Sequence, residues 1–309
     1  MSKILIAIPT YQRPDGLRQV LQSIAVLETR HEVVVLVVNN DYSGKSQLEF
    51  SIQQLRDTGY RFPLLLRHED RRGISHARNM IVCEALKSID TDVLVMIDDD
   101  EFPSAQWLDE LIDTQSELAA DIVGGPVSRI FEDSRIPDYL RRYNDGKHMS
   151  VKREKIEFIG STANILIDMR FLRRFPNERF DVEFGMTGGG DYEFLKRAKK
   201  LGASFAWAPQ ALIQETFPIS RSSVEWSLKR AYRSANAEAR VAIKHRQLSG
   251  VAMMLVGGFA GLIAGKVKGG RASSPPAIFR ARVMEMRALG KLDAFRGRKY
   301  EEYAIVHGQ

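Results

Sequence analysis

The sequence has a single cysteine among its 309 residues, Cys83, and no long apolar segment near its start. One cysteine cannot form an intramolecular disulfide or a cysteine-type zinc cage, so a disulfide-stapled secreted scaffold and a structural zinc domain are excluded. A reducing compartment is therefore expected. The first apolar run ends at Pro9 and no small-residue cleavage site follows it, so we expect no signal peptide.

The sequence also lacks a Gly-x-Gly-x-x-Gly segment after a predicted strand, which argues against a dinucleotide dehydrogenase. With 44% hydrophobic and 27% charged residues, the composition is close to the globular average, and this excludes disordered, collagen-like and coiled-coil chains. The length allows one large α/β domain with an appendage, or two modest domains.

Acidic and basic residues are unevenly distributed. Residues 221–309 hold 17 Lys and Arg against 6 Asp and Glu, a net +11, whereas residues 1–220 hold 28 against 33, a net −5. We therefore place a domain boundary after residue 220 and expect a basic, helical C-terminal region. Its charge favours nucleic acid, an anionic membrane surface or a phosphorylated substrate, and an ordinary solvated basic face is an equal alternative.

Residues 248–265 form a charge-free stretch of 18 residues that includes five glycines. A membrane-spanning helix needs about 20 apolar residues, so this stretch is marginal. Lys244 and Arg246 precede it, and Lys266 and Lys268 follow it, so positive charge gives no orientation. A span, an interfacial or re-entrant hairpin and a buried core helix all remain open.

The N-terminal part alternates between compact apolar runs and helical periodicity, which is typical of a mostly parallel sheet flanked by helices. The expected strands are 3–8, 32–38, 63–66, 92–97, 120–124 and 158–167. The expected helices are 14–27, 75–86, 108–119, the segment from 190 to 201 and most of the chain beyond 222. Residues 132–154 are a polar, basic connection, and loops of that length are usually lids or binding elements.

Polar residues follow two of these strands. Asn39, Asn40 and Asp41 end the second, and four acids, residues 98–101, end the strand at 92–97. Ligands bind beyond the carboxyl ends of parallel strands. Crowded carboxylates raise one another's pKa unless a cation or an array of donors compensates, and hard oxygens suit Mg²⁺ or Mn²⁺. The cluster predicts a divalent metal bridging to a diphosphate, with a solvated acidic loop or helix N-cap as the alternative.

A second acidic position follows three glycines. Asp191 could accept a proton from a substrate hydroxyl there, although a flexible turn with an N-cap Asp would look the same. Trp226 and Arg230 lie four residues apart on an expected helix and share a face, or form part of a packing stripe. Further arginines could bind phosphate in a bidentate fork, or singly be surface charges: Arg71, Arg72, Arg78, Arg221 and Arg233.

Taken in order, the segments IAIPTYQRP, VVNND, RRGISHARN, VLVMIDDDE and GGGDYEF resemble the family 2 glycosyltransferases. These are inverting enzymes with the GT-A fold. Residues 97–107 look most like the bacterial exopolysaccharide glucosyltransferases of the succinoglycan type. The resemblance covers about residues 3–220, and it implies an α/β GT-A domain over 1–220 that is followed by the helical basic extension over 221–309.

The resemblance also assigns roles to matched positions. Asp191 would be the catalytic base, and Asp98 and Asp100 would hold the metal, with Glu215 standing where many relatives have a metal-binding histidine. The donor-binding residues would be Pro9, Tyr11, Arg13, Asn39, Asn40, Asp41, Arg72, Gly73, Arg78, Asp98 and Asp99. The acceptor or the diphosphate would be contacted by Thr162, Asn164, Gly190, Glu193, Trp226 and Arg230.

These roles imply an inverting transfer of a hexose, such as glucose, from a nucleoside-diphosphate sugar, expected to be a UDP-sugar. The acceptor would be a saccharide on polyprenyl diphosphate, in exopolysaccharide or cell-surface polysaccharide synthesis. Mg²⁺ or Mn²⁺ would be the cofactor. We expect a cytoplasmic protein at the inner membrane face, without a nucleic-acid partner. The alternatives are a sugar-nucleotide pyrophosphorylase and a non-catalytic sugar-nucleotide or nucleic-acid binding protein.

Overall fold

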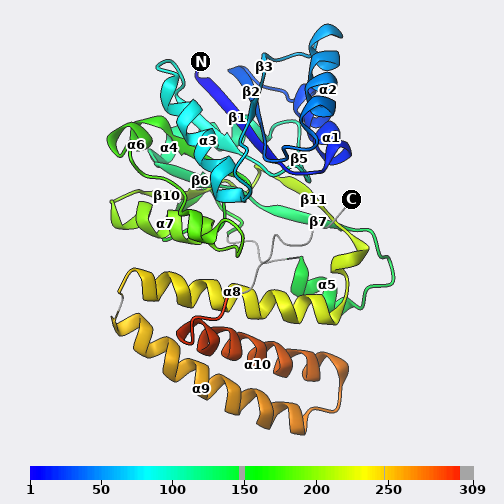
Figure 1. The fold of residues 1–309 in the computed structure, drawn as a ribbon, viewed down its shortest axis with the longest axis vertical. Coiled ribbons are helices and arrows are strands. Elements are labelled where there is room, and N and C mark those ends of the chain that lie inside the picture. Colours follow the sequence, from blue (N-terminus) through cyan, green and yellow to red (C-terminus); the bar gives the residue numbers. More distant parts are fainter. Residues whose placement is uncertain (146–149, 247, 300–309) are drawn as a thin grey trace.

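The computed structural model describes residues 1–145, 150–246 and 248–299 (Figure 1). Its main sheet has eight strands in the order β3-β2-β1-β4-β9-β6-β10-β8. Only β9 and β8 run antiparallel to their neighbours, so the sheet is mostly parallel, as expected. The strands are β1 (Lys3–Thr10), β2 (Glu32–Asn39), β3 (Leu64–His68), β4 (Val93–Met96), β6 (Ile122–Gly124), β8 (Glu154–Ile156), β9 (Ile165–Asp168) and β10 (Phe205–Trp207).

Helices cover both faces of this sheet. Because successive strand residues point to opposite faces, Ile4, Ile6 and Ile8 share one core cluster, while Leu5 and Ala7 belong to another. The first cluster includes side chains of α1 (Pro14–Ala25), α2 (Lys45–Asp57) and α4 (Trp107–Leu118). The second includes side chains of α3 (Ile74–Lys87), α6 (Met169–Arg174) and α7 (Gly190–Lys200). Burial on both faces accounts for the continuous apolar strand sequences.

A second sheet of three strands was not predicted. It has the order β5-β11-β7 and consists of β5 (Glu101–Pro103), β11 (Ile213–Phe217) and β7 (Val127–Phe131). Its register sets Glu215 opposite Glu101 on one side and beside Arg129 on the other. Charged residues from distant parts of the chain therefore meet next to the acidic cluster.

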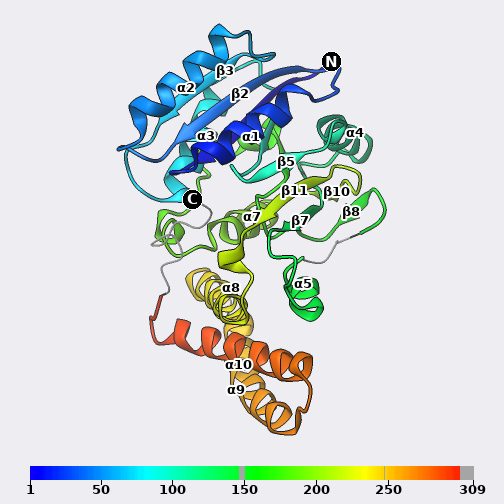
Figure 2. The ribbon, with the colours of Figure 1, turned by 90° about the vertical axis from the view of Figure 1, so that its right-hand side faces the viewer.

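Three C-terminal helices follow the sheets, as the sequence predicts. They are α8 (Val224–Lys244), α9 (Leu248–Arg271) and α10 (Pro275–Phe295). α8 lies nearest the sheets, α10 packs beneath it, and α9 is outermost (Figures 1 and 2). A short 3-10 turn, Ile219–Arg221, leads into α8, and the domain boundary after residue 220 stays a prediction.

One predicted strand is wrong in its bounds, and some helices were not predicted. The strand expected at 158–167 is present only as β9, because polar residues precede it and Asn164 adopts a positive φ of 54°. α2 was not predicted, since Ile52 is its only fully buried residue. The connection at 132–154 contains α5 (Asp138–Asn144), and residues 146–149 of it lie outside the described part.

One described helical segment, Gly250–Arg271, is long and apolar enough to cross a bilayer by length and composition, with a mean hydropathy of 1.7. Only 11% of its most apolar window is buried, so the buried core helix is excluded among the alternatives for this region.

Gly290 lets α10 approach α8 closely. A Cβ there would lie 2.2 Å from the carbonyl oxygen of Tyr232. We expect Gly290→Ala to lower the free energy of unfolding by about 1–3 kcal/mol, the usual cost of overpacking, as measured by urea denaturation. In the control variant Gly257→Ala the new methyl group meets open space, so stability should stay unchanged or rise slightly. Equal destabilisation of both variants would contradict the conclusion that α10 needs a glycine at position 290 to pack closely against α8.

Candidate active site

The carboxyl ends of three parallel strands form one edge of the main sheet. Thr10 ends β1 opposite Asn39 of β2, and Asp98 follows β4, which pairs with β1. A cavity of about 300 Å³ opens at this edge and is closed on one side by α8. Its wall contains thirteen of the predicted site residues: Pro9, Tyr11, Arg13, Asn40, Arg72, Gly73, Arg78, Asp98, Asp99, Asp100, Glu215, Trp226 and Arg230.

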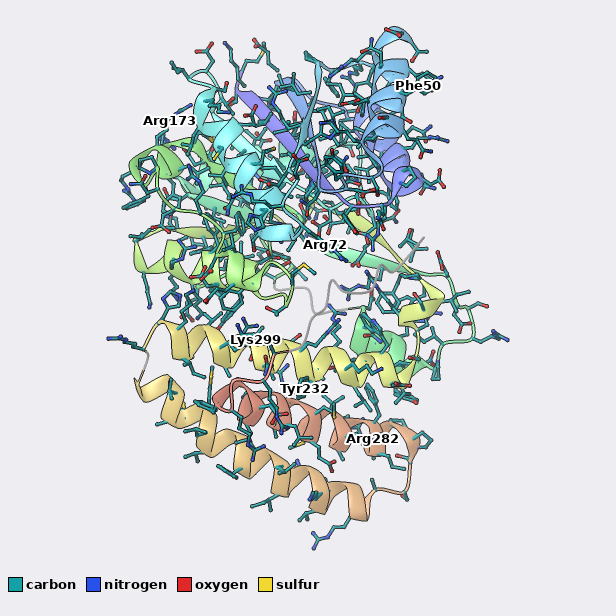
Figure 3. The ribbon with its side chains drawn as sticks, viewed as in Figure 1. Phe50, Arg72, Arg173, Tyr232, Arg282 and Lys299 are labelled. Carbon is teal, nitrogen blue, oxygen red and sulfur yellow. The ribbon has the colours of Figure 1, made fainter. Side chains whose placement is uncertain are left out.

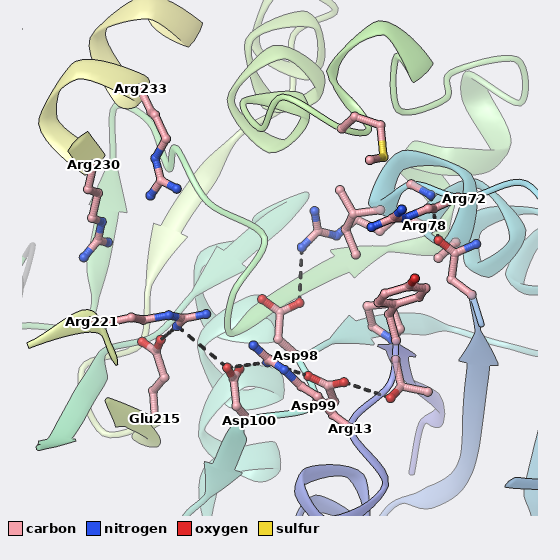
Figure 4. Close-up of a pocket in the computed structure, with 18 of the residues that line it drawn as sticks. Arg13, Arg72, Arg78, Asp98, Asp99, Asp100, Glu215, Arg221, Arg230 and Arg233 are labelled. Atoms are coloured by element: carbon pink, nitrogen blue, oxygen red, sulfur yellow. Dashed lines mark hydrogen bonds and ion pairs between the residues drawn. The ribbon is translucent and has the colours of Figure 1, made fainter. Parts of the chain in front are cut away.

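Arg13 holds the middle of the acidic cluster. Its Nη1 donates to Asp99 at 3.0 Å and to Asp100 at 2.7 Å, and the hydroxyl of Thr10 donates to Asp99 at 2.8 Å (Figure 4). Burial, together with the charge of Asp100, raises the pKa of Asp99, while Arg13 opposes the rise. Asp99 is thus an anchor for the cluster, and Asp100 is the more exposed carboxylate.

Arg78 contacts both the Asp98 carboxylate and the Asp191 carboxylate. Its Nη2 lies 3.2 Å from Asp98 Oδ1, its Nη1 lies 2.5 Å from Asp191 Oδ1, and its side chain is 5% exposed. Burial raises the pKa of Asp98, the charges of Asp100 and Asp191 add to the rise, and Arg78 opposes it. The predicted metal carboxylate and the predicted base therefore lie on the same side of the sheet, within reach of one guanidinium group.

The glycine run fixes the position of Asp191. Gly188 and Gly189 have φ values of +73° and +93°, a backbone region that favours glycine. Gly189 also lets the start of α7 approach α8, because a Cβ there would lie 2.7 Å from the Cβ of Ala237. Asp191 lines a second hollow, which α8 also borders. Arg230 and Arg233 line both hollows, so the two adjoin at α8.

The acidic cluster faces cationic side chains and hydrogen-bond donors from α8 and from the 3-10 turn that precedes it. The guanidinium carbons of Arg221, Arg230 and Arg233 lie 5.9, 5.5 and 5.7 Å from the ring centroid of Trp226. Desolvation, together with the charge of Arg129, lowers the pKa of Arg230 to about 10. Among the described residues, Trp226 Nε1 and Arg221 Nε are buried without a hydrogen-bond partner. Buried donors of this kind can hydrogen-bond an anionic ligand, and Figure 4 shows Arg230 and Arg233 pointing from α8 toward the cluster.

The acidic cluster offers two carboxylates, those of Asp98 and Asp100, to a divalent cation. No group of three or more potential ligand side chains is assembled within the described ranges. Mg²⁺ and Mn²⁺ commonly use one or two protein carboxylates and complete their shell with water and phosphate oxygens, which Asp98 and Asp100 fit. Glu215 lies in the cavity wall, but its carboxylate contacts Arg129 at 2.9 Å and Arg221 at 3.5 Å. A ligand role for Glu215 stays a prediction.

Two residues predicted to contact the acceptor are not in either hollow, and these predictions are wrong. Asn164 is fully buried; it accepts from Trp107 Nε1 at 2.7 Å and donates to the carbonyls of Ala211 and Pro126. Glu193 is 1% exposed, and its carboxylate binds Arg197 and His245 at 2.7 and 2.8 Å. Both side chains are saturated by internal partners and stabilise the fold.

The segment after β2 is held by internal hydrogen bonds. Asn39 and Asp41 hydrogen-bond to each other through the Asn39 side chain, and neither is among the residues that line the cavity, so their donor contacts stay predictions. Asn40 is in the wall, but its side chain donates to the carbonyls of Glu69 and Arg71 and accepts from Gly73 N at 2.8 Å. This segment shapes the loop beside the cavity.

Thr162 and Gly190 lie next to Asp191 without lining a hollow. The backbone N–H of Thr162 donates to Asp191 Oδ2 at 3.5 Å, and Gly190 begins α7, where a Cβ would lie 3.1 Å from the Ser75 hydroxyl. Thr162 and Gly190 therefore position the side chain of Asp191.

Sequence reasoning left several residues of the wall without a committed site role. Arg221 and Arg233 were named only among the arginines that could bind phosphate, and Thr10 could have been found as the last residue of a strand at the ligand edge. Arg129 and Phe217 carried no local signal, because the pairing of β7 with β11 places them there.

Comparisons with known proteins found similar sequences and similar folds. The model of the family described as Glycosyl transferase family 2 matches residues 5–180. The succinoglycan biosynthesis protein ExoM of Rhizobium meliloti (strain 1021) is 29% identical over 236 residues, which are 76% of this chain and 74% of that protein.

Solved structures are similar over nearly the whole chain. The mannosyltransferase PcManGT from Pyrobaculum calidifontis, in complex with GDP-Man and Mn²⁺, has a TM-score of 0.61 at 16% identity and covers 96% of this chain and 87% of its own. S. aureus TarS 1–349 in complex with UDP has a TM-score of 0.52 at 14% identity, with coverages of 96% and 92%.

We expect Arg230→Gln to weaken binding of UDP or GDP by about tenfold or more, because a charged hydrogen bond to phosphate is lost. The melting temperature should stay the same or rise, since Arg230 is partly buried and has no ion pair among the described residues. Calorimetric titration and thermal denaturation check both expectations, with the exposed Arg282→Gln as the control. Unchanged affinity would contradict the anion-binding role.

Proposed function

The chain belongs to glycosyl transferase family 2 and is a glycosyltransferase with the GT-A fold, and on this basis we propose that it transfers a hexose from a nucleoside-diphosphate sugar to a saccharide hydroxyl with inversion. The observation that carries this proposal is the pairing of Asp98 and Asp191 with one guanidinium, at the junction of two adjoining hollows. Family membership disfavours both alternatives, the pyrophosphorylase and the non-catalytic binding protein.

The larger cavity would hold the donor. Its base would lie beside Pro9 and Tyr11, where the guanidinium of Arg72 stacks 5.3 Å from the Tyr11 ring. The diphosphate would then reach the carboxylates at one end and Arg230 at the other. UDP in the TarS structure and GDP-Man in the PcManGT structure support a nucleotide-sugar donor. We propose a UDP-sugar, with glucose as the hexose.

Asp98 and Asp100 would hold Mg²⁺ or Mn²⁺ against the diphosphate, and the Mn²⁺ in the PcManGT structure supports this assignment. When bound, the cation would stabilise negative charge on the leaving phosphate oxygens. Arg13 orients Asp100 for that contact. Arg230 would add electrostatic stabilisation on the opposite side, where its partial burial strengthens the interaction.

Asp191 would act as the general base. In this step the acceptor hydroxyl oxygen bonds to the anomeric carbon, its proton passes to the Asp191 carboxylate, and the bond from that carbon to the phosphate oxygen breaks. The bonding electron pair leaves with the nucleoside diphosphate, and an α-linked donor yields a β-glycoside. Arg78 orients the carboxylate from behind through its 2.5 Å contact.

The second hollow would hold the acceptor, since Asp191 lies in its wall beside Tyr192 and Glu238. We propose a saccharide carried on polyprenyl diphosphate, in the synthesis of an exopolysaccharide or another cell-surface polysaccharide. The similarity to ExoM, a succinoglycan biosynthesis protein, supports this class of acceptor. The basic C-terminal helices and their arginines support an anionic, lipid-linked molecule.

We expect Asp191→Asn to lower turnover by about a hundredfold or more, because a positioned general base contributes roughly that factor. Donor binding should remain, since Asp191 does not line the donor cavity. Transfer from a labelled UDP-sugar and UDP titration by calorimetry measure the two effects. Asp90→Asn, whose side chain is 76% exposed, is the control. Turnover near that of the control would remove Asp191 from the base role.

Chelation of divalent cations should abolish transfer, and added Mn²⁺ or Mg²⁺ should restore it. We expect Asp100→Ala to bind Mn²⁺ at least about tenfold more weakly in the presence of UDP, measured by electron paramagnetic resonance, because one of two carboxylate ligands is lost. Glu215→Gln in parallel decides whether Glu215 is a ligand. Full activity in excess chelator would refute the metal assignment.

A further inference from the structure

The inner face of α9 is built from glycines that pack against α10. Gly258, Gly261 and Gly265 recur every three or four residues and share one side of the helix. A Cβ would lie 3.1 Å from Leu292 at the first of these positions and 2.5 Å from the Glu285 side chain at the third. The two helices therefore form a tight hairpin, and this side of α9 is covered.

The other side of α9 carries a row of exposed apolar side chains, which we call the outer face. These residues also recur every three or four positions, so they lie along one line of the helix. Their exposed fractions run from 47% to 72%: Met253, Val256, Phe259, Ile263 and Val267. Soluble monomers seldom leave a contiguous apolar row of this length open to water. Figure 1 shows α9 as the outermost helix, remote from the sheets.

The charges around the outer face have one sign. α9 contains no acidic residue, and exposed cations gather where α9 ends and α10 begins. We call this group the basic end: Lys266, Lys268, Arg271, Arg280 and Arg282. None of the five makes an ion pair within the described residues. Figure 3 shows Arg282 at this end of the hairpin.

We propose that the outer face of α9 is the membrane-docking surface of this protein and that its partner is a bilayer containing anionic phospholipids. The helix would lie along the bilayer surface, with its apolar side chains at the boundary between headgroups and acyl chains and the basic end against lipid phosphates. An amphipathic helix of this kind gains both apolar burial and electrostatic attraction.

The hairpin argues for a helix that lies in the interface and against one that spans. α10 covers the glycine side of α9, and it carries charged residues such as Arg280 and Glu285. α10 is in turn fixed to α8, where Asn236 Nδ2 donates to the Gly290 carbonyl at 3.0 Å. If α9 crossed the bilayer together with α10, the charged residues of α10 would be buried in hydrocarbon. If α9 crossed alone, it would lose the contacts of its glycines with α10. Both changes are costly.

Charge also favours lipid over a second copy of this chain. α9 carries no acidic residue, so a second copy that paired through its own outer face would offer no charge complementary to the basic end. An anionic bilayer offers the opposite sign over a flat area. The surface is separate from the donor cavity, so this inference can fail while the proposed transfer reaction stands.

The test is sedimentation of the full chain with vesicles of phosphatidylglycerol and phosphatidylcholine. We expect Phe259→Gln combined with Ile263→Gln to reduce vesicle partitioning by about tenfold or more, because two large apolar contacts with lipid are lost. Neutralising Lys266, Lys268 and Arg271 to Gln should remove the preference for anionic over pure phosphatidylcholine vesicles and its dependence on salt. The control Phe50→Gln changes an equally exposed ring on α2 and should bind normally.

Circular dichroism and UDP binding establish that each variant is folded. Wild-type protein bound to vesicles should be released by alkaline carbonate, as expected for an interfacial helix. Resistance to carbonate would overturn the interfacial geometry. Unchanged partitioning of the outer-face variant would overturn the docking surface. A lipid-free dimer that this variant converts to a monomer, with no change in vesicle binding, would assign the face to a second copy.

Discussion

Among the described residues, the guanidinium of Arg78 contacts both Asp98, the proposed metal ligand, and Asp191, the proposed base. It comes from α3, is almost fully buried, and reaches Asp98 after β4 and Asp191 at the start of α7. Without a cation at this point, acids from two distant parts of the chain would repel each other in a partly buried site. The ion pairs of Arg78 therefore join α3 to the end of β4 and to the start of α7.

The carboxyl ends of the parallel strands form one side of the cavity, and α8 closes another side. β1, β2 and β4 present their carboxyl ends together, which gathers Thr10 and the acidic cluster. α8 completes the wall with Trp226 and Arg230, so residues beyond the family match at 5–180 belong to the site. Without α8 the cavity wall would lack Trp226, Arg230 and Arg233.

Local patterns in the sequence predicted most of this arrangement. Apolar runs and helical periodicity identified the strands and helices of the first hundred residues, except the polar α2, and the acids after β4 and the glycine run lie where predicted. Non-local pairing could not be predicted. The second sheet placed Arg129 beside Glu215, and the partners that remove Asn164 and Glu193 from the site, Trp107 and His245, are more than fifty positions away in the chain.

α8 serves two neighbours at once. One part of this 21-residue rod bears Arg230 at the cavity, and the adjoining turns hold Asn236 against the Gly290 carbonyl of α10. The same helix therefore forms part of the cavity wall and packs against α10. Because α8 is one continuous helix, a tilt of the hairpin relative to the sheets would move Arg230 and the cavity wall with it.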